Sequence, residues 1–293
     1  MNMDFKSAKE LLALCAENAL PISEVMRRRE CLLGEVEQDA VDRRMAKAWD
    51  IMRASATQPL ETPIKSMGGL IGGEAKTLQA HAAEGKGICG DMLQKAMTYA
   101  MAVLEVNASM GLIVAAPTAG SAGVVPGLLL ALQECYDLPD GRIVDALFNA
   151  GAVGYLAMRN ATVAGAVGGC QAEVGIASAM AASAAVELLG GTPQQCLDAA
   201  STVLMNMLGL VCDPVGGLVE YPCQNRNAAG VANALVAAEM ALSGIRQLIP
   251  FDQMLEAMYA VGKRLPAELR ETALGGCAAT PAACAACGLC SGN

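Results

Sequence analysis

Apolar residues recur at helical spacing through the charged first part of the chain. The pattern predicts two or three amphipathic helices over residues 5–55, punctuated by Pro21 and Gly34. Each helix has an apolar stripe for a core and a solvated side. The apolar positions are Leu11, Leu12, Cys15 and Leu20, followed by Val41, Met45, Trp49 and Met52.

The second half of the chain contains a segment with few polar residues. Residues 161–190 are mostly Ala, Gly, Val and Met, which predicts a fully buried helix or pair of helices. Thr192, Pro193 and Gln195 form a helix start, with a Thr cap, Pro at the first position and Gln three residues after the cap. Helices are also predicted over 91–110, 127–135, 140–160, 193–208, 226–247, 252–263 and 266–273.

The alternation that strands need is mostly missing, so the predicted class is mainly α. Two loops rich in Gly and Pro, 56–73 and 115–127, interrupt the helices. No internal repeat or low-complexity linker divides the chain. We therefore expect a single compact helical domain over residues 1–274, followed by a cysteine-rich tail over 275–293.

Composition narrows the choice of partners. The chain is 54% hydrophobic but only 3% aromatic, and Ala, Gly and Met allow close helix packing. A net charge of −9 and a pI near 4.7 argue against nucleic acid as the main partner. The basic run Arg27, Arg28 and Arg29 is predicted to lie on a solvated helix face.

An uncharged stretch, residues 106–133, is long enough to span a bilayer. Pro117, Pro126 and several glycines interrupt it, and no aromatic belt or cluster of positive charge flanks it. We expect a buried core segment with a functional loop, and no membrane partner.

Twelve cysteines follow an N-terminus that carries charges where an export signal needs an apolar core. We therefore expect a cytoplasmic protein with reduced thiols, which indicate metal binding, catalysis or small buried side chains. His81 is the single histidine, which makes His-rich zinc sites and Ser–His–Asp catalysis unattractive.

The cysteines form two candidate sites. Cys170, Cys212 and Cys223 lie in apolar, glycine-rich settings, and three thiolates can hold an iron–sulfur cluster with one iron left without a protein ligand. On spacing alone the tail is the stronger signal, although a terminal peptide is a poor cage. The tail has the pattern C-x2-C-x2-C at Cys284, Cys287 and Cys290. The cysteines expected in the core are Cys15, Cys31, Cys89, Cys135 and Cys196.

Two glycine loops, 66–73 and 117–123, carry backbone N–H groups and small hydroxyls. Such loops either bind an anion, for instance a carboxylate, at a helix N-terminus or form plain turns between helices. The sequence leaves both interpretations open. Neither loop has the GK[ST] of a Walker A motif or the dinucleotide pattern GxGxxG.

Long strings of rare residues carry a resemblance that runs through nearly the whole chain. The sequence resembles the α subunit of the bacterial iron–sulfur-dependent L-serine dehydratases, which are carbon–nitrogen lyases. The strings are SMGGLIGGEA (66–75), APTAGSAGVVPG (116–127), GAVGGCQAEVGIASAMAA (165–182), GLVCDPVGGLVEYPCQNRNA (209–228) and TALGGCAATP (272–281).

The resemblance implies a mostly helical catalytic domain that holds a 4Fe–4S cluster through Cys170, Cys212 and Cys223. The open iron would act as a Lewis acid on the hydroxyl of L-serine, giving pyruvate and ammonia in amino-acid catabolism and gluconeogenesis. Such an exposed iron predicts oxygen sensitivity. No motif indicates pyridoxal phosphate. The nearest candidates for a lysine that would bind this cofactor are Lys65 and Lys76.

The resemblance identifies the ligand cysteines more directly than it identifies the residues that act on the substrate. The catalytic candidates are Lys65, Glu173 and Arg226, with Asp213 as a further possible base; Glu173 could instead support a ligand cysteine. Arg226 either pairs with the substrate carboxylate or ties down its loop. The substrate-binding candidates are Ser66, Gly68, Gly69, Thr118, Gly120, Ser121 and Asn225.

Two departures from the family pattern matter. The chain lacks the Ser-His-Thr motif that relatives carry on an additional domain or β subunit, so we expect a separate β partner. The tail cysteine Cys290 is the candidate that would fold back and cap the open iron. Alternatives are a cluster-dependent lyase for threonine or cysteine, and an electron-transfer or binding protein that uses the tail cysteines.

Overall fold

The computed structural model describes residues 3–287, and within that span no β-strand forms, which confirms the predicted mainly α class. An isolated bridge joins Cys212 to Arg270. The α-helices are α1 (Ala8–Asn18), α2 (Ile22–Gly34), α3 (Gln38–Glu61), α4 (Glu74–Ala83), α5 (Gly90–Ala108), α6 (Val124–Cys135), α7 (Asp140–Asn160), α8 (Gly165–Gly168), α9 (Ile176–Leu188), α10 (Pro193–Asn206), α11 (Cys223–Leu242), α12 (Phe251–Gly262) and α13 (Pro281–Cys287). Short 3-10 turns are η1 (Ala119–Ser121), η3 (Val215–Gly217), η4 (Ala267–Leu269) and η5 (Gly276–Ala279), and η2 (Gln171–Gly175) is a π-helical turn.

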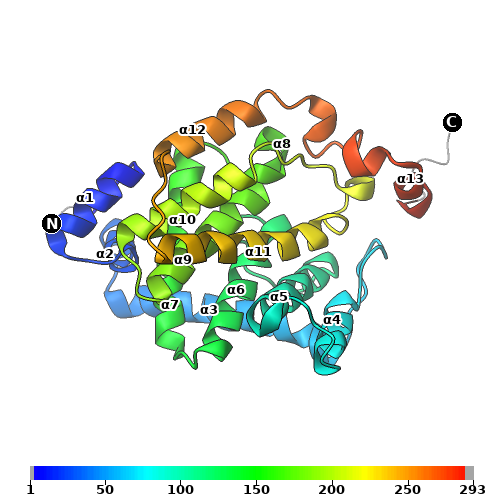
Figure 1. Cartoon of the computed structure of the whole chain (residues 1–293), viewed down its shortest axis with the longest axis horizontal. Helices are drawn as coiled ribbons and strands as arrows, with labels where there is room; N and C mark the ends of the chain where they lie inside the picture. Colours follow the sequence, from blue (N-terminus) through cyan, green and yellow to red (C-terminus); the bar gives the residue numbers. More distant parts are fainter. Residues whose placement is uncertain (1–2, 288–293) are drawn as a thin grey trace.

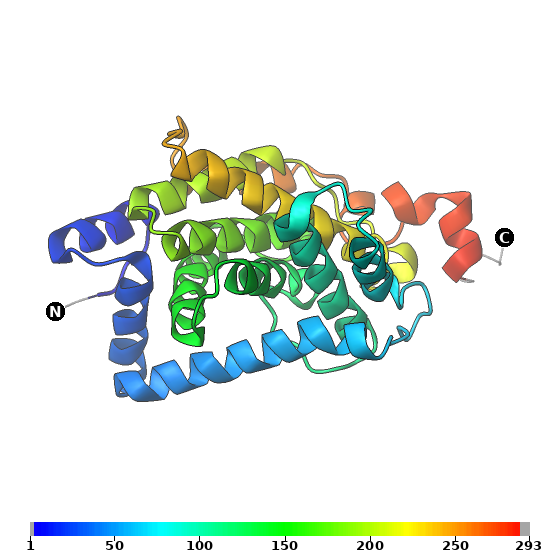
Figure 2. The same ribbon diagram turned by 60° about the horizontal axis from the view of Figure 1, so that its bottom comes forward.

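Helix α9 is the centre of the core. Every residue of α9 except Glu187 is buried, which confirms the buried helix predicted within residues 161–190. It packs against α7, α10, α11 and α6, and Figure 1 shows it enclosed by these helices. In Figure 2 the long helix α3 runs along one side of this bundle. The bundle therefore forms the packed body from which the loops project.

Small residues allow the close helix packing that the composition predicts. Helices α5 and α6 cross at Gly127, where a Cβ atom would lie 2.8 Å from the backbone nitrogen of Ala100. Any larger residue would push the two helices apart. Thr192 and Gln195 form the predicted capping box at the start of α10.

Several predicted boundaries are wrong. Helix α3 continues to Glu61 through Pro59, since Ala56 and Pro59 are buried and packing outweighs the cost of proline. Helix α6 begins at Val124 rather than 127, with Pro126 in its first turn, where no N–H is needed. The helix expected at 266–273 is only the short turn η4, and helices α4 and α13 were not predicted.

The uncharged stretch 106–133 comprises the end of α5, a loop, η1 and most of α6. Among the helices of residues 3–287, none has both the length and the apolar character needed to cross a bilayer.

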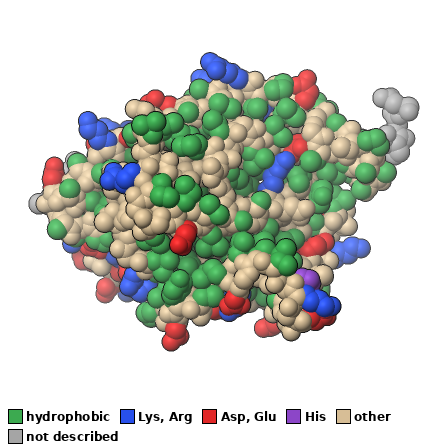
Figure 3. All heavy atoms as spheres, viewed as in Figure 1, with side chains coloured by type: hydrophobic (Ala, Val, Ile, Leu, Met, Phe, Trp, Pro, Cys, Tyr) green, Lys and Arg blue, Asp and Glu red, His purple; other side chains and the backbone are tan. Residues whose placement is uncertain are grey.

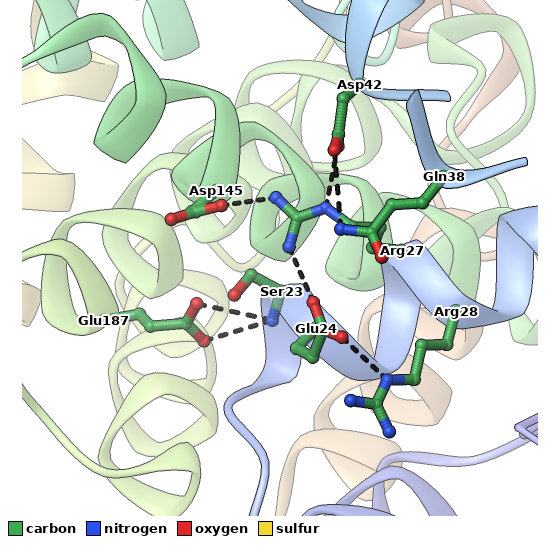
Figure 4. A network of polar contacts seen from close by, with 8 residues as sticks. All are labelled: Ser23, Glu24, Arg27, Arg28, Gln38, Asp42, Asp145 and Glu187. Carbon is green, nitrogen blue, oxygen red and sulfur yellow. Dashed lines mark hydrogen bonds and ion pairs between the residues drawn. The ribbon is translucent and has the colours of Figure 1, made fainter. Parts of the chain in front are cut away.

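The basic run on α2 is not the solvated face that the sequence predicts. Only Arg28 is exposed, whereas Arg27 and Arg29 are buried. Figure 4 shows the Arg27 guanidinium between carboxylates from three helices: Glu24 at 2.7 Å, Asp42 at 2.8 Å, and Asp145. The guanidinium also lies 4.6 Å from the centre of the Phe148 ring. One buried cation thus joins α2, α3 and α7.

Replacing Arg27 with Met removes this cation and leaves three carboxylates facing one another. We expect the free energy of unfolding to fall by about 3 kcal/mol, since breaking a buried ion pair from one side leaves uncompensated charge. The matched control is Arg28→Met on the same helix, whose single exposed pair is worth less than about 1 kcal/mol. Urea unfolding of both variants checks this, and equal losses would contradict it.

Candidate functional site

The sequence-predicted site residues gather at one end of the helical body. Figures 1 and 2 both place the loop before α4, the segment between η3 and α11, and helix α13 at this end, opposite α1. Gly68 N of the loop before α4 donates to Glu220, and Cys277 N of η5, just before α13, donates to Asp213, although these partners are far apart in the sequence.

The three internal cysteines are held on different segments. Cys170 directly precedes η2, Cys212 lies in an extended segment, and Cys223 is the first residue of α11. Their residues are 3%, 4% and 8% exposed, respectively. All three are free thiols.

The electrostatics show that the three thiols share one environment. Contact with the Cys212 thiol lowers the pKa of Cys170 against the effect of burial, and Arg226 lowers it further. The same contact and burial raise the pKa of Cys212. Burial raises the pKa of Cys223 to about 12, with the nearby charges of Cys170 and Glu173 adding to the shift. Together the three thiols form a buried set of sulfur donors.

Gln171 ties the first two cysteine segments together. Its backbone N–H donates to Leu210 O at 3.0 Å, and its side-chain oxygen accepts from Gly209 N at 2.8 Å. Its side-chain amide donates to Gly168 O and Met258 O. Cys212 N in turn donates to Leu269 O at 2.9 Å, so an irregular segment is fixed on both sides.

Glu173 joins the second glycine loop to the cysteines. Thr118 Oγ1 donates to Glu173 Oε1 at 2.9 Å and lies 3.1 Å from Ser121 Oγ. Cys212 Sγ lies 3.6 Å from Glu173 Oε2. Burial raises the pKa of Glu173, and the bond from Thr118 opposes that rise. A Cβ atom on Gly165 would lie 2.5 Å from Glu173 Oε2 and 2.9 Å from Cys212 Sγ, so this contact needs a glycine there.

Arg226 is paired within the chain. Its guanidinium lies 2.7 Å from Asp213 Oδ1 and donates to Val211 O at 2.9 Å. Asp213 Oδ2 also accepts from Cys277 N at 2.6 Å, which fixes the start of the tail against the site. A pocket of about 530 Å³ opens beside Arg226, lined by Leu210 and Asn233 among others.

The first glycine loop binds a carboxylate of the chain itself, that of Glu220. Ser66 Oγ donates to Glu220 Oε2 at 2.7 Å, and the backbone N–H groups of Gly68 and Leu70 donate at 2.7 and 2.9 Å. Gly69 N donates to Ser66 Oγ. The polar groups predicted to meet a substrate therefore have internal partners here.

Three other candidates stand apart from this network. Lys65 and Asn225 are exposed, and no hydrogen bond or ion pair joins either side chain to another described residue. Lys76 donates to Glu61 O at the end of α3.

The remaining cysteines divide differently from the prediction. Cys15 and Cys196 are buried and Cys31 is half-buried, but Cys89 and Cys135 are exposed, so their assignment to the core was wrong. Cys89 directly precedes α5 and Cys135 is the last residue of α6, so both lie at helix ends outside the core. Cys290 lies outside the described residues.

Sequence reasoning missed Glu220, Asn227 and Gln171. Asn227 is fully buried; its oxygen accepts from Gly123 N, and its amide donates to Gly120 O and Cys223 O at 2.8 Å. It thereby fixes the second glycine loop on α11. A signal was present, because each residue stands one to four positions from a candidate ligand cysteine.

The donor set suits an iron–sulfur cluster. Among the described residues no group of three or more His, Cys, Asp or Glu side chains is arranged to hold a metal ion. A cluster differs from a single ion because each thiolate binds a separate iron. Buried sulfurs from three segments, with the Arg226 guanidinium close to Cys170, fit that requirement.

The fold and the site define a helical protein with a thiol-lined centre, and the comparisons with known proteins give its family. The family model described as serine dehydratase alpha chain matches residues 17–290. The chain belongs to this family.

The names of similar proteins agree with this family. The chain is 48% identical over 277 residues to "Probable L-serine dehydratase, alpha chain" of Bacillus subtilis, covering 94% of this chain and 92% of that protein. It is 45% identical to "L-serine dehydratase, alpha chain" of Peptoniphilus asaccharolyticus, covering 93% of each. It is 37% identical to "L-serine dehydratase 1" of Escherichia coli, covering 94% of this chain but 61% of that protein.

Replacing Asn227 with Ala leaves buried donors and acceptors of the second glycine loop without partners. We expect the free energy of unfolding to fall by roughly 2–3 kcal/mol. Asn225→Ala, two residues earlier on the same helix and exposed, should change it by less than about 0.5 kcal/mol. Urea denaturation compares them, and an Asn227→Ala loss as small as that of Asn225→Ala would show that the loop needs no such anchor.

Proposed function

We propose that this chain is the α subunit of an L-serine dehydratase, which converts L-serine to pyruvate and ammonia with a 4Fe–4S cluster on Cys170, Cys212 and Cys223. The observation that carries the proposal is the convergence of three buried thiols from separate segments. The family membership and the names of the relatives support the substrate.

Held by three thiolates, such a cluster supplies a Lewis acid for the serine hydroxyl. The residues around it keep water out and hold the thiols in place. Glu173 lies against Cys212 and is half-buried, so it is the carboxylate best placed to accept a proton from the substrate. Thr118 orients Glu173, and Arg226 holds the Cys170 side of the site positive.

The two glycine loops supply polar groups for the substrate's carboxylate and amine. We assign this role to the predicted set of Ser66, Gly68, Gly69, Thr118, Gly120, Ser121 and Asn225. Ser66 and Gly68 already donate to Glu220, and Thr118 donates to Glu173, so in this proposal these donors would meet the substrate only by exchanging an internal partner for it. Lys65 is exposed and no hydrogen bond or ion pair joins its side chain to another described residue, so Glu173 is preferred as the base.

A β subunit completes the enzyme in this proposal. The Escherichia coli relative is longer, since this chain covers only 61% of it, and two shorter relatives are named alpha chains. Met67, Leu218, Tyr221 and Leu274 are exposed apolar side chains on the segments around the site. Figure 3 shows that apolar side chains are spread between scattered charges over the side of the molecule seen in Figure 1.

The chain would then act as a catalytic domain over residues 1–274 with a tail over 275–293, in the cytoplasm. The tail begins where Cys277 N donates to Asp213. A cap on the open iron by Cys290 fits this anchoring, because it brings the start of the tail next to the cysteine segments.

Iron and acid-labile sulfide per chain, measured after anaerobic reconstitution, test the location of the cluster. We expect about four of each in the wild type and a collapse in Cys212→Ala. The matched control, Cys284→Ser with Cys287→Ser, should keep the full content. Loss in the control and retention in Cys212→Ala would move the cluster to the tail and overturn the proposal. Serine turnover by the complex with the β subunit should fall in air and return with ferrous iron and thiol.

Glu173→Gln tests the proposed base. The variant keeps the size of the side chain but cannot take a proton, so kcat for L-serine should fall at least about 100-fold. Iron content should stay at the wild-type level, and Glu239→Gln, exposed on α11, should leave kcat unchanged. An intact kcat combined with lost iron would instead assign Glu173 to support of the ligand Cys212.

A further inference from the structure

Glu220 stands three residues before Cys223 and is only 3% exposed. A buried carboxylate is costly unless its oxygens accept hydrogen bonds. Here Oε1 accepts from Gly68 N, and Oε2 accepts from Ser66 Oγ and Leu70 N, at 2.7–2.9 Å. Every donor belongs to the loop 66–71, which lies 150 residues away in sequence.

That loop is itself fixed. Met67 N donates to Ala108 O at the end of α5, and Ser66 N donates to Ile71 O, which closes the loop on itself. Ser66 Oγ also accepts from Gly69 N and Ile71 N. The carboxylate of Glu220 is therefore bound to a loop that the helical body already holds.

The main chain of Glu220 is hydrogen-bonded to the first turn of α11. Its carbonyl accepts from Gln224 N at 2.9 Å, a bond that starts α11. Cys223 is the first residue of that helix and lies between these two partners. Wherever the Glu220 side chain is held, the first turn of α11 and the Cys223 sulfur are held with it.

We infer that Glu220 is a positioning residue for Cys223: its carboxylate, bound by Ser66 Oγ and the N–H groups of Gly68 and Leu70, holds the start of α11 so that the thiol stays buried among the other two. The role of this latch for a cluster ligand rests on the proposed function. The latch itself is a property of the chain without the cluster.

Glu220→Gln is the decisive variant. An amide has one acceptor oxygen, and its NH2 group must face a donor of the loop, so at least one bond is lost whichever way it turns. Asp252→Asn is the matched control, because Asp252 also accepts two backbone N–H groups from a distant segment, Ala8 and Lys9, at the opposite end. Ser66→Ala tests the latch from the loop side.

The first readout is the alkylation rate of individual thiols in the full chain without cluster, measured by mass spectrometry. In Glu220→Gln and Ser66→Ala we expect Cys223 to react at least tenfold faster, while the fully buried Cys196 stays within twofold of wild type. Amide hydrogen exchange should accelerate in residues 66–71 at the same time. A merely destabilising change would speed Cys196 and Cys223 together, and that result, or an unchanged Cys223, overturns the inference.

The second readout is iron retention by the reconstituted chain in the presence of a chelator. The half-life of bound iron should shorten at least fivefold in Glu220→Gln and stay unchanged in Asp252→Asn. Equal shortening in both variants would contradict a positioning role. If the wild type takes up no iron, the proposed function fails, and thiol reactivity and amide exchange still decide whether Glu220 holds Cys223.

Discussion

The site depends on one constraint: a carboxylate taken out of water must have its oxygens satisfied by donors of the protein. Three acidic residues stand beside the three internal cysteines, and each accepts hydrogen bonds from, or pairs with a cation of, a different segment. Glu173 binds Thr118 of the second glycine loop, Asp213 binds Arg226 and the start of the tail, and Glu220 binds the first glycine loop. Each thiol is thereby fixed to a part of the chain that local structure alone would leave free.

This constraint explains how irregular segments can carry a defined site. Cys212 lies in an extended stretch with no regular neighbour except the bridge to Arg270, and Cys170 sits where α8 gives way to a π-helical turn. Such segments have few helical bonds to hold them, so side chains such as Gln171 and Asn227 satisfy their backbone groups instead. These polar side chains thereby attach the loops to the packed bundle around α9.

Much of the fold was predictable because helical periodicity and capping act locally. The Thr192 capping box and the buried run of α9 needed no tertiary information. The errors arose where packing overrides local preference. Pro59 stays helical because its turn is buried, and Arg27 leaves solvent because Asp42 and Asp145 from other helices join Glu24 of its own helix around it. In the site, the resemblance supplied the cysteines, whereas Glu220 was missed because its partners lie 150 residues away.

The distribution of the thiols has a consequence for assembly. A C-x2-C motif can present ligands from one short peptide, but Cys170, Cys212 and Cys223 meet only when η2, the 212 segment and the start of α11 are in place. In the proposed enzyme, a ligand set that exists only in the folded chain would couple cluster binding to folding. Because three carboxylates already hold these segments, less ordering would remain for the proposed cluster to induce. The internal carboxylates and the thiols are thus parts of one preorganised centre.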